Sequence, residues 1–240
     1  RACGRRRRIA ARIASRTTAT TGAGYADCVL AFRRMTTPPA DSASAALYQE
    51  ALATFGRLLE DARASGDPEP TAMTLATARD HRACARIVLL KGFDARGFRF
   101  FTNHESDKGR QLAARPQVAL CFHWKTLRDG VQVRIEGCAE KLAAAESDAY
   151  FATRARGSQL GAWASLQSRP LADRAEFGAR LADVERRFAG VPVPRPPHWG
   201  GYVVEPDRIE FWYGAYFRLH ERRLYARDAD GAWSRGLLYP

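Results

Sequence analysis

The spacing of hydrophobic residues predicts one long helix followed by a series of strands. From Ser42 to about Ala64, apolar residues recur every three or four positions, the spacing of one buried helix face. After the helix-ending Gly66-Asp67-Pro68, shorter segments either alternate between apolar and polar residues or run continuously apolar, as strands do. They predict strands at Glu69–Thr77, Arg86–Lys91, Phe98–Thr102, Gln117–Trp124, Val131–Leu142, Arg208–Tyr213 and Arg222–Arg227, with strand structure resuming at Tyr202.

Three further helices are predicted between these strands. The first runs from the N-cap residue Ser106 to Arg115, the second covers Ala143–Arg154 and is broken by Gly157-Ser158-Gln159, and the third covers Leu171–Phe188. Short turns join most of the strands, which indicates antiparallel pairing. No G-x-G-x-x-G motif follows a strand, which argues against a dinucleotide-binding fold. The pattern favours a mainly β, α+β fold: a small antiparallel barrel with helices packed outside.

Length and composition fit one soluble domain. The chain has 240 residues, of which 46% are hydrophobic, enough for one substantial core. No apolar run approaches the roughly 18 residues that a membrane span needs, so we expect no membrane association.

The formal net charge of +12 is concentrated near the N-terminus. Residues 1–34 hold nine Arg and one Asp, whereas the rest of the chain holds 29 basic and 25 acidic residues. We therefore divide the chain into a basic leader, residues 1–34, and a single domain, residues 35–240. The leader fits sequence upstream of a start at Met35, an organellar targeting segment or a nucleic-acid-binding arm. For the domain itself we predict no nucleic-acid partner.

The five cysteines form no C-x-x-C pair. Those outside the leader fall in predicted strands, where cysteine acts as a small hydrophobic residue. This usage indicates a reducing compartment without disulfides or structural zinc, and we expect a cytoplasmic protein with no metal site.

Two stretches have the chemistry of phosphate binding. In Arg86-Ile-Val-Leu-Leu-Lys91, four aliphatic residues lie between two cations, which predicts a strand buried on both faces with a positive charge at each end. In Ser106-Asp107-Lys108, a helix start with free N–H groups lies beside a lysine. Each signal is weak alone, because core strands and capped helices are common.

An ordered series of motifs gives these stretches their meaning. Besides those already named, the series comprises Phe101-Thr102-Asn103, Arg154 to Trp163, Gln167-Ser168, Trp199-Gly200-Gly201, Ile209-Glu210-Phe211-Trp212 and Arg218-Leu219-His220-Glu221-Arg222. Together, over residues 69–240, these motifs resemble the pyridoxamine (pyridoxine) 5′-phosphate oxidase family.

The resemblance implies an antiparallel split β-barrel of Greek-key type and a homodimer with FMN at the subunit interface. It implies oxidation of pyridoxine 5′-phosphate or pyridoxamine 5′-phosphate to pyridoxal 5′-phosphate, with O2 as acceptor and hydrogen peroxide as product. The amine substrate would also release ammonia.

The resemblance also implies roles for residues at the matching positions. The FMN-binding set is Arg86, Ile87, Val88, Leu89, Leu90, Lys91, Phe101, Thr102, Lys108, Gln132, Gln167, Ser168, Trp212 and Arg222. The substrate-binding set is Lys91, Tyr150, Arg154, Ser158, Arg218, Leu219 and His220, of which Arg218 and His220 are the catalytic candidates. Because residues 218 and 220 alternate around Leu219, an extended segment would place both on one face.

These residue types agree with the implied chemistry, since two phosphate-bearing ligands need two separate groups of cations and hydroxyl donors. Asp107 departs from the family, where many relatives carry a cation, and we expect it to weaken FMN binding. Two other functions remain open: a split-barrel flavoenzyme for another substrate, and a non-catalytic binding protein for FMN or pyridoxal phosphate.

Overall fold

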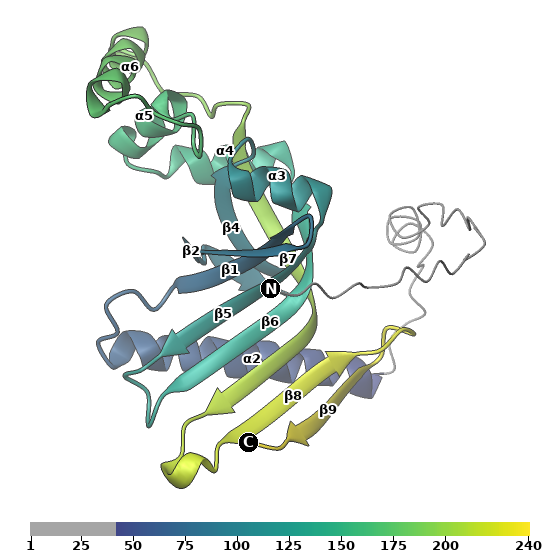
Figure 1. The fold of residues 1–240 in the computed structure, drawn as a ribbon. Coiled ribbons are helices and arrows are strands. Elements are labelled where there is room, and N and C mark those ends of the chain that lie inside the picture. Colours follow the sequence, from purple (N-terminus) through teal and green to yellow (C-terminus); the bar gives the residue numbers. More distant parts are fainter. Residues whose placement is uncertain (1–41) are drawn as a thin grey trace, which may run out of the picture. The chain divides into compact units, whose positions relative to one another are not determined.

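The computed structural model describes residues 42–240 (Figure 1). The leader and its proposed start at Met35 therefore lie outside the described residues. The helices are α2 (Ser42–Ala64), α3 (Asp107–Ala114), α4 (Ala144–Ala152), α5 (Arg156–Ala164), α6 (Arg174–Arg187) and the short 3-10 helix η1 (Tyr216–Arg218). The strands are β1 (Ala72–Arg79), β2 (Arg82–Leu89), β3 (Gly92–Asp94), β4 (Gly97–Asn103), β5 (Gln117–Trp124), β6 (Val131–Lys141), β7 (Trp199–Tyr213), β8 (Glu221–Arg227) and β9 (Trp233–Leu238).

The nine strands form one sheet, and every pairing among residues 42–240 is antiparallel, as predicted. The main order is β2-β1-β5-β6-β7-β4-β3, with β8 paired to β7 and β9 to β8. Strand β7 is 15 residues long and changes partner along one edge. Its first part pairs with β4 from Trp199 to Val204, and its last part pairs with β8 from Arg208 to Tyr213.

Helix α2 provides much of the core. It crosses the sheet beside the lower ends of the strands (Figure 1) and buries the apolar stripe predicted from its spacing. Phe55, at the centre of this stripe, contacts the rings of Phe93, Phe98 and Phe122 at centroid distances of 4.9, 4.9 and 5.1 Å. Close edge-to-face contacts of this kind add to the stabilisation from apolar burial, so α2 holds the two sides of the sheet together.

A second apolar cluster lies at the other end of the domain. Its fully buried members are Phe151, Leu160, Phe188, Val193 and Trp199, contributed by α4, α5, the end of α6, the following loop and the start of β7. This cluster anchors the helical part, α4 to α6, to the first residues of β7 (Figure 1). The helices within residues 42–240 lack the combination of length and hydrophobicity that a membrane span requires.

Strand β2 differs from its prediction in both extent and burial. It begins at Arg82 rather than Arg86, so Arg86 lies within the strand, and the side chain of Ile87 is 63% exposed. In the chain order of the sheet, β2 is a terminal strand with β1 as its neighbour. Ala83, Ala85 and Ile87 alternate along β2 and are all exposed, so one face of the strand is uncovered and the prediction of burial on both faces was wrong for the single chain.

Two helix predictions also need correction. Gly157, Ser158 and Gln159 do not break the helical region but form the first turns of α5, and the break lies at residues 153–155. Helix α6 begins at Arg174 rather than Leu171, because Asp173 is its N-cap and accepts a hydrogen bond from the Glu176 N–H at 2.8 Å.

Candidate functional site

Arg86 is oriented by hydrogen bonds to two neighbouring elements. Its guanidinium donates to the Leu75 carbonyl oxygen at 3.2 Å and the Thr77 hydroxyl at 2.5 Å on β1, and to Gln111 Oε1 on α3 at 2.8 Å. Thr77 and Gln111 are buried and hydrogen-bonded to each other at 2.6 Å. The fold therefore fixes this cation before any ligand binds, which is the preorganisation that anion recognition needs.

Lys108 lies close to this arginine, in the first turn of α3. Its ammonium donates to Gln167 Oε1 at 2.8 Å, and the Thr102 hydroxyl donates to the same oxygen at 3.4 Å. Burial lowers the pKa of Lys108, and the charge of Arg86 lowers that pKa further. The positive charges of Arg86 and Lys108 repel one another beside the start of α3. An anion such as phosphate bound there would stabilise both charges. We call Arg86, Thr102, Lys108 and Gln167 the first cationic group.

The start of α3 is fixed by capping. Ser106 is the N-cap, as predicted, and its hydroxyl accepts from the Gly109 N–H at 3.2 Å. A Cβ at position 109 would lie 2.1 Å from the His104 carbonyl oxygen, so the turn requires glycine there. The Asp107 carboxylate is hydrogen-bonded to Arg110 within the same turn. Part of its charge is thus compensated within the helix.

Arg154 forms a separate site at the start of β7. Its guanidinium lies over the ring of Trp199 at 4.7 Å, and its Nη1 is buried without a hydrogen-bond partner among the described residues. Burial also lowers the pKa of Arg154. A buried charged donor without a partner is costly, so this geometry suits an anionic ligand. Tyr150, one turn earlier, stacks on Phe101 with ring centroids 3.9 Å apart. We call Phe101, Tyr150, Arg154 and Trp199 the Arg154 group.

Two members of the predicted substrate-binding set stand apart from this group. Lys91 follows the end of β2, and Ser158 lies in the first turn of α5; both are exposed. Within residues 42–240, neither side chain makes a hydrogen bond or ion pair with the Arg154 group. Phe101, predicted with the flavin-binding set, joins Tyr150 instead, whereas its neighbour Thr102 joins Gln167.

The aliphatic residues of the β2 motif divide between two environments. Leu90 is buried and Val88 packs against the main core, whereas Ile87 is exposed. A ligand on the outer surface of β2 could therefore contact the Ile87 side chain, whereas the Leu90 side chain is inaccessible and those of Val88 and Leu89 are half-buried. Ser168 lies beside Gln167 with a φ of 71°.

A third set of predicted residues meets at the far end of β7. In the sheet, Trp212 is paired with Gln132 on β6 and Arg222 on β8. The His220 ring lies 4.5 Å from the Trp212 ring, and His220 Nδ1 accepts from the Ala215 N–H at 3.2 Å. Arg222 donates from Nε to Glu210 at 2.7 Å, and Glu210 is only 2% exposed. We call Gln132, Trp212, His220 and Arg222 the His220 group.

The prediction of an extended segment at Arg218-Leu219-His220 was wrong. Tyr216–Arg218 forms the helical turn η1, and the φ angles of Phe217 and Arg218 are 55° and 62°. Period-two alternation therefore does not apply to residues 218 and 220. His220 is anchored on Trp212, whereas Arg218 and Leu219 are exposed.

The Arg154 and His220 groups cannot meet within one chain. Trp199, which contacts Arg154, begins β7, and Trp212, which contacts His220, is its penultimate residue. At about 3.3 Å per strand residue, these positions are roughly 40 Å apart. Figure 1 shows the same separation, with α3 and α4 at one end of the sheet and the β7–β8 connection at the other.

The supporting roles of three residues were not anticipated from the sequence. Gln111 orients Arg86, Glu210 orients Arg222, and Trp199 provides the ring beneath Arg154. Glu210 had a signal that could have been used: it is the only charged residue in the segment from Ile209 to Tyr213, and buried acids in proteins are normally paired.

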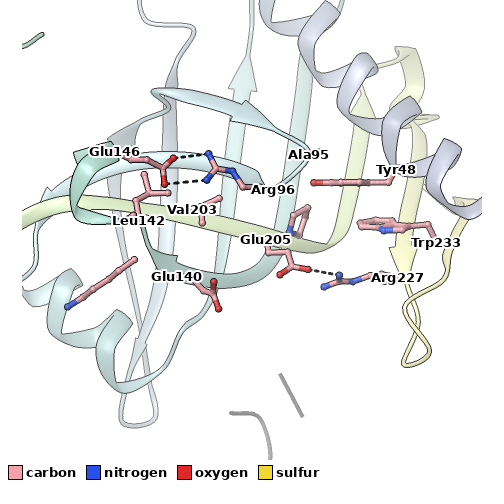
Figure 2. Close-up of a pocket in the computed structure, with 13 residues that line it drawn as sticks. Tyr48, Ala95, Arg96, Glu140, Leu142, Glu146, Val203, Glu205, Arg227 and Trp233 are labelled. Atoms are coloured by element: carbon pink, nitrogen blue, oxygen red, sulfur yellow. Dashed lines mark hydrogen bonds and ion pairs between the residues drawn. The ribbon is translucent and has the colours of Figure 1, made fainter. Parts of the chain in front are cut away.

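A cavity of about 430 Å³ lies where β7 changes from β4 to β8. Figure 2 shows the Arg96–Glu146 and Arg227–Glu205 pairs on its walls, with Tyr48 beside Trp233. The Tyr48 hydroxyl is buried without a hydrogen-bond partner among the described residues. None of the predicted site residues lines this cavity, so it is distinct from the three groups above.

The comparison with known families covers most of the domain. The model for pyridoxamine 5′-phosphate oxidase matches residues 59–188, and the model for the pyridoxine 5′-phosphate oxidase C-terminal dimerisation region matches residues 199–240. The pyridoxine/pyridoxamine 5′-phosphate oxidase of Myxococcus xanthus (strain DK1622) is 57% identical over 187 residues, 78% of this chain and 89% of that protein. That of Xanthomonas euvesicatoria pv. vesicatoria (strain 85-10) is 58% identical over 196 residues, 81% of this chain and 98% of that protein.

Solved structures show the same fold. PhzG from Burkholderia lata 383, in complex with tetrahydrophenazine-1-carboxylic acid, superimposes with a TM-score of 0.74 at 34% identity, covering 79% of this chain and 92% of that chain. A pyridoxamine 5′-phosphate oxidase-related, FMN binding protein from Nostoc punctiforme PCC 73102 superimposes with a TM-score of 0.63 at 17% identity, covering 78% and 96%. These likenesses confirm the predicted fold class, an antiparallel split barrel with helices.

Proposed function

Because the chain belongs to the pyridoxamine 5′-phosphate oxidase family, we propose that it oxidises pyridoxine 5′-phosphate or pyridoxamine 5′-phosphate to pyridoxal 5′-phosphate. FMN is the cofactor and O2 the final electron acceptor, so hydrogen peroxide is formed, and the amine substrate also releases ammonia. The buried Nη1 of Arg154, which has no partner among residues 42–240, is the observation that carries the proposal.

That unpaired donor identifies where a substrate phosphate would bind. Arg154 is held over Trp199, and Tyr150 places a second donor one helical turn away. A phosphate accepting from both would satisfy the buried guanidinium by a charge-assisted hydrogen bond. Lys91 and Ser158 are the further donors that the family pattern adds.

The first cationic group fits the phosphate of FMN. Arg86 is already aimed by Thr77 and Gln111, and Lys108 is destabilised by the neighbouring positive charge. When bound, FMN would accept the hydride from C4′ of the substrate and pass the electrons to O2. The protein residues then have to bind and orient, and no protein nucleophile is needed.

The active protein is a homodimer in this proposal, with FMN at the interface. Gln132, Trp212 and Arg222 belong to the same predicted flavin set as Arg86 and Lys108, yet they lie at the other end of β7. A second copy in antiparallel orientation would bring the two ends together, giving two equivalent sites. The exposed Ile87 on β2 is then a candidate contact with the partner subunit and FMN.

Arg218 and His220 would act at the substrate ring. His220 is fixed by Trp212 and the Ala215 N–H, so it can hydrogen-bond a ring substituent in a defined direction. Arg218, exposed on the neighbouring turn, would close over the ring, orient C4′ and stabilise charge as hydride leaves.

The test is aerobic peroxide formation by the purified protein with FMN and pyridoxine 5′-phosphate. We expect one peroxide for each pyridoxal 5′-phosphate formed, and little turnover of unphosphorylated pyridoxine, because Arg154 would lack its ligand. The absence of pyridoxal 5′-phosphate with bound FMN would refute the proposal. Turnover of a tetrahydrophenazine carboxylic acid instead would support the alternative of a split-barrel oxidase for another substrate, which the likeness to PhzG raises.

A further inference from the structure

The turn between β7 and β8 presents an aromatic tip to solvent. Tyr216 is 79% exposed, Phe217 is 93% exposed and Leu219 is 70% exposed. These three residues surround Arg218, so the apolar surface adjoins a predicted catalytic residue. Large apolar side chains gathered at one exposed turn are unusual on a surface that stays in water.

The base of this turn is rigid. The Gly214 N–H donates to the Gly130 carbonyl oxygen at 2.8 Å, and the Ala215 N–H donates to His220 Nδ1 at 3.2 Å. A Cβ at position 214 would lie 2.2 Å from the Asp129 carbonyl oxygen, so the base is closely packed as well. The tip is therefore held in place by residues beneath it, although its own side chains are uncovered.

The backbone of the tip is strained. Phe217 and Arg218 have φ angles of 55° and 62°, a left-handed conformation that non-glycine residues rarely adopt. Such conformations persist where surrounding contacts hold them, and they concentrate at functional sites. Here the hydrogen bonds beneath the turn hold the backbone, while among residues 42–240 nothing covers the Phe217 side chain, which points to a contact outside the single chain.

A second copy of the same chain is the occupant that fits. The tip lies within residues 199–240, which match the dimerisation region of the family. It also adjoins the His220 group, which in the proposed dimer faces the Arg154 group of the other subunit. We propose that Tyr216 and Phe217 form an aromatic clamp that closes over the substrate ring in the second subunit's Arg154 group and excludes water from it.

This inference rests on the proposed function and deepens it. In that dimer, Phe217 would cover the flat pyridine ring, while Arg154 binds the phosphate at the other end of the substrate. An apolar cover stabilises the bound substrate and the transition state alike, so it lowers the Michaelis constant more than it changes turnover. Phe217 is thus a positioning residue, and Arg218 beside it remains the catalytic candidate.

The experiment compares Phe217→Ser, Tyr216→Ser and the conservative Phe217→Trp in the FMN-loaded full chain. We expect Phe217→Ser to raise the Michaelis constant for pyridoxine 5′-phosphate about tenfold, from lost burial of most of one aromatic side chain. Turnover should change less than threefold, and Phe217→Trp should restore the parental constant. Val191→Ser, an exposed apolar residue in the loop after α6, is the matched control.

Three outcomes would overturn the clamp. One is a Michaelis constant for Phe217→Ser equal to that of the parent and of Val191→Ser. Another is a raised constant that follows dissociation of the dimer in size-exclusion chromatography with light scattering, which would make the tip a structural contact. The third is full recovery by Phe217→Gly, which suits a φ of 55° and would show that backbone conformation alone matters. If the parent itself fails to oxidise the substrate, the proposed function fails instead.

Discussion

The two ends of β7 differ in how completely one chain builds them. At the first end, Arg86 and Lys108 are hydrogen-bonded to residues of the same chain, and Arg154 lies on the ring of Trp199. At the last end, His220 is anchored, but Arg218 and its aromatic neighbours are exposed on a strained turn. The first end presents oriented cations, whereas the second leaves its predicted catalytic residue uncovered. In the proposed function, binding and catalysis would therefore be divided between the two ends of a single strand.

The sharpest way to test that division is to remove Arg218. We expect Arg218→Met to lower turnover by roughly 10²-fold or more, as for a positioned catalytic group, with FMN still bound. The measurement is steady-state oxidation of pyridoxine 5′-phosphate at saturating FMN, with the flavin spectrum as control for cofactor binding. If Arg218→Met turns over as fast as the parent protein, Arg218 has no role in the chemical step, and the end of β7 near His220 loses its predicted catalytic residue.

Arg154→Met should act differently, because it removes a phosphate anchor. We expect the Michaelis constant to rise roughly tenfold or more, from the loss of a hydrogen bond between charged groups, with a smaller change in turnover. The same assay measures both constants. A fall in turnover with an unchanged Michaelis constant would assign Arg154 to the chemical step rather than to binding.

Mixing the two variants tests whether the ends meet between subunits. In a mixed dimer of Arg218→Met and Arg154→Met chains, one site carries both changes and the other carries neither. Random exchange should therefore restore about a quarter of the parental activity at a substrate concentration where each variant alone is nearly inactive. Exchange proven by mass spectrometry without recovered activity would show that each site is built within one chain.

A smaller effect is expected at Asp107, beside the first cationic group. Its carboxylate is paired with Arg110 and exposed, so its unfavourable action on a bound phosphate is screened. We expect Asp107→Asn to tighten FMN binding by no more than a few fold, measured by fluorescence titration of the apoprotein. Asp183→Asn, which removes a comparable exposed Arg pair on α6, is the control. Weaker FMN binding would indicate that the carboxylate supports the start of α3 instead.

The last prediction concerns stability rather than the site itself, through His104, next to α3. Burial, followed by the charges of Lys141 and Arg195, lowers the pKa of His104 from 6.5 to about 4. Between these values the unfolded chain binds a proton that the folded chain does not, so stability should fall as pH falls from about 6.5 towards 4. His104→Gln should reduce this dependence in urea unfolding, and the exposed His81→Gln should not. Equal pH dependence in all three proteins would contradict the assignment.

Much of the fold follows from local sequence. The boundaries of α2 and β5 agree with their predictions, because an apolar stripe or alternation long enough to bury one face dictates the element that buries it. The N-cap at Ser106 was likewise readable from its residue type. The prediction failed at Gly157–Gln159, where local propensity and tertiary packing conflict. Glycine and serine favour a turn locally, but packing of Leu160 in the second cluster stabilises helix α5.

The candidate site could be proposed from the sequence as a set of residues but not as an arrangement. Motif order singled out Arg86, Lys108, Arg154 and His220, whose side chains are of the types that bind phosphate and ring substituents. The sequence does not reveal that Gln111 orients Arg86 or that Glu210 orients Arg222, because these partners lie 25 and 12 positions away along the chain. Such contacts depend on which strands and helices become neighbours.

The sequence alone therefore determined most of the elements, the residue types of the candidate site and the family. Only the tertiary structure decided that β2 leaves Ile87 uncovered, that β7 separates the Arg154 and His220 groups, and that Arg218 lies on a strained turn. The physical reason is that periodicity reports which face of an element is apolar, whereas the position of that element in the sheet decides what covers the face. In this chain the uncovered faces and the two separated groups of candidate residues are the features on which the proposed dimer rests.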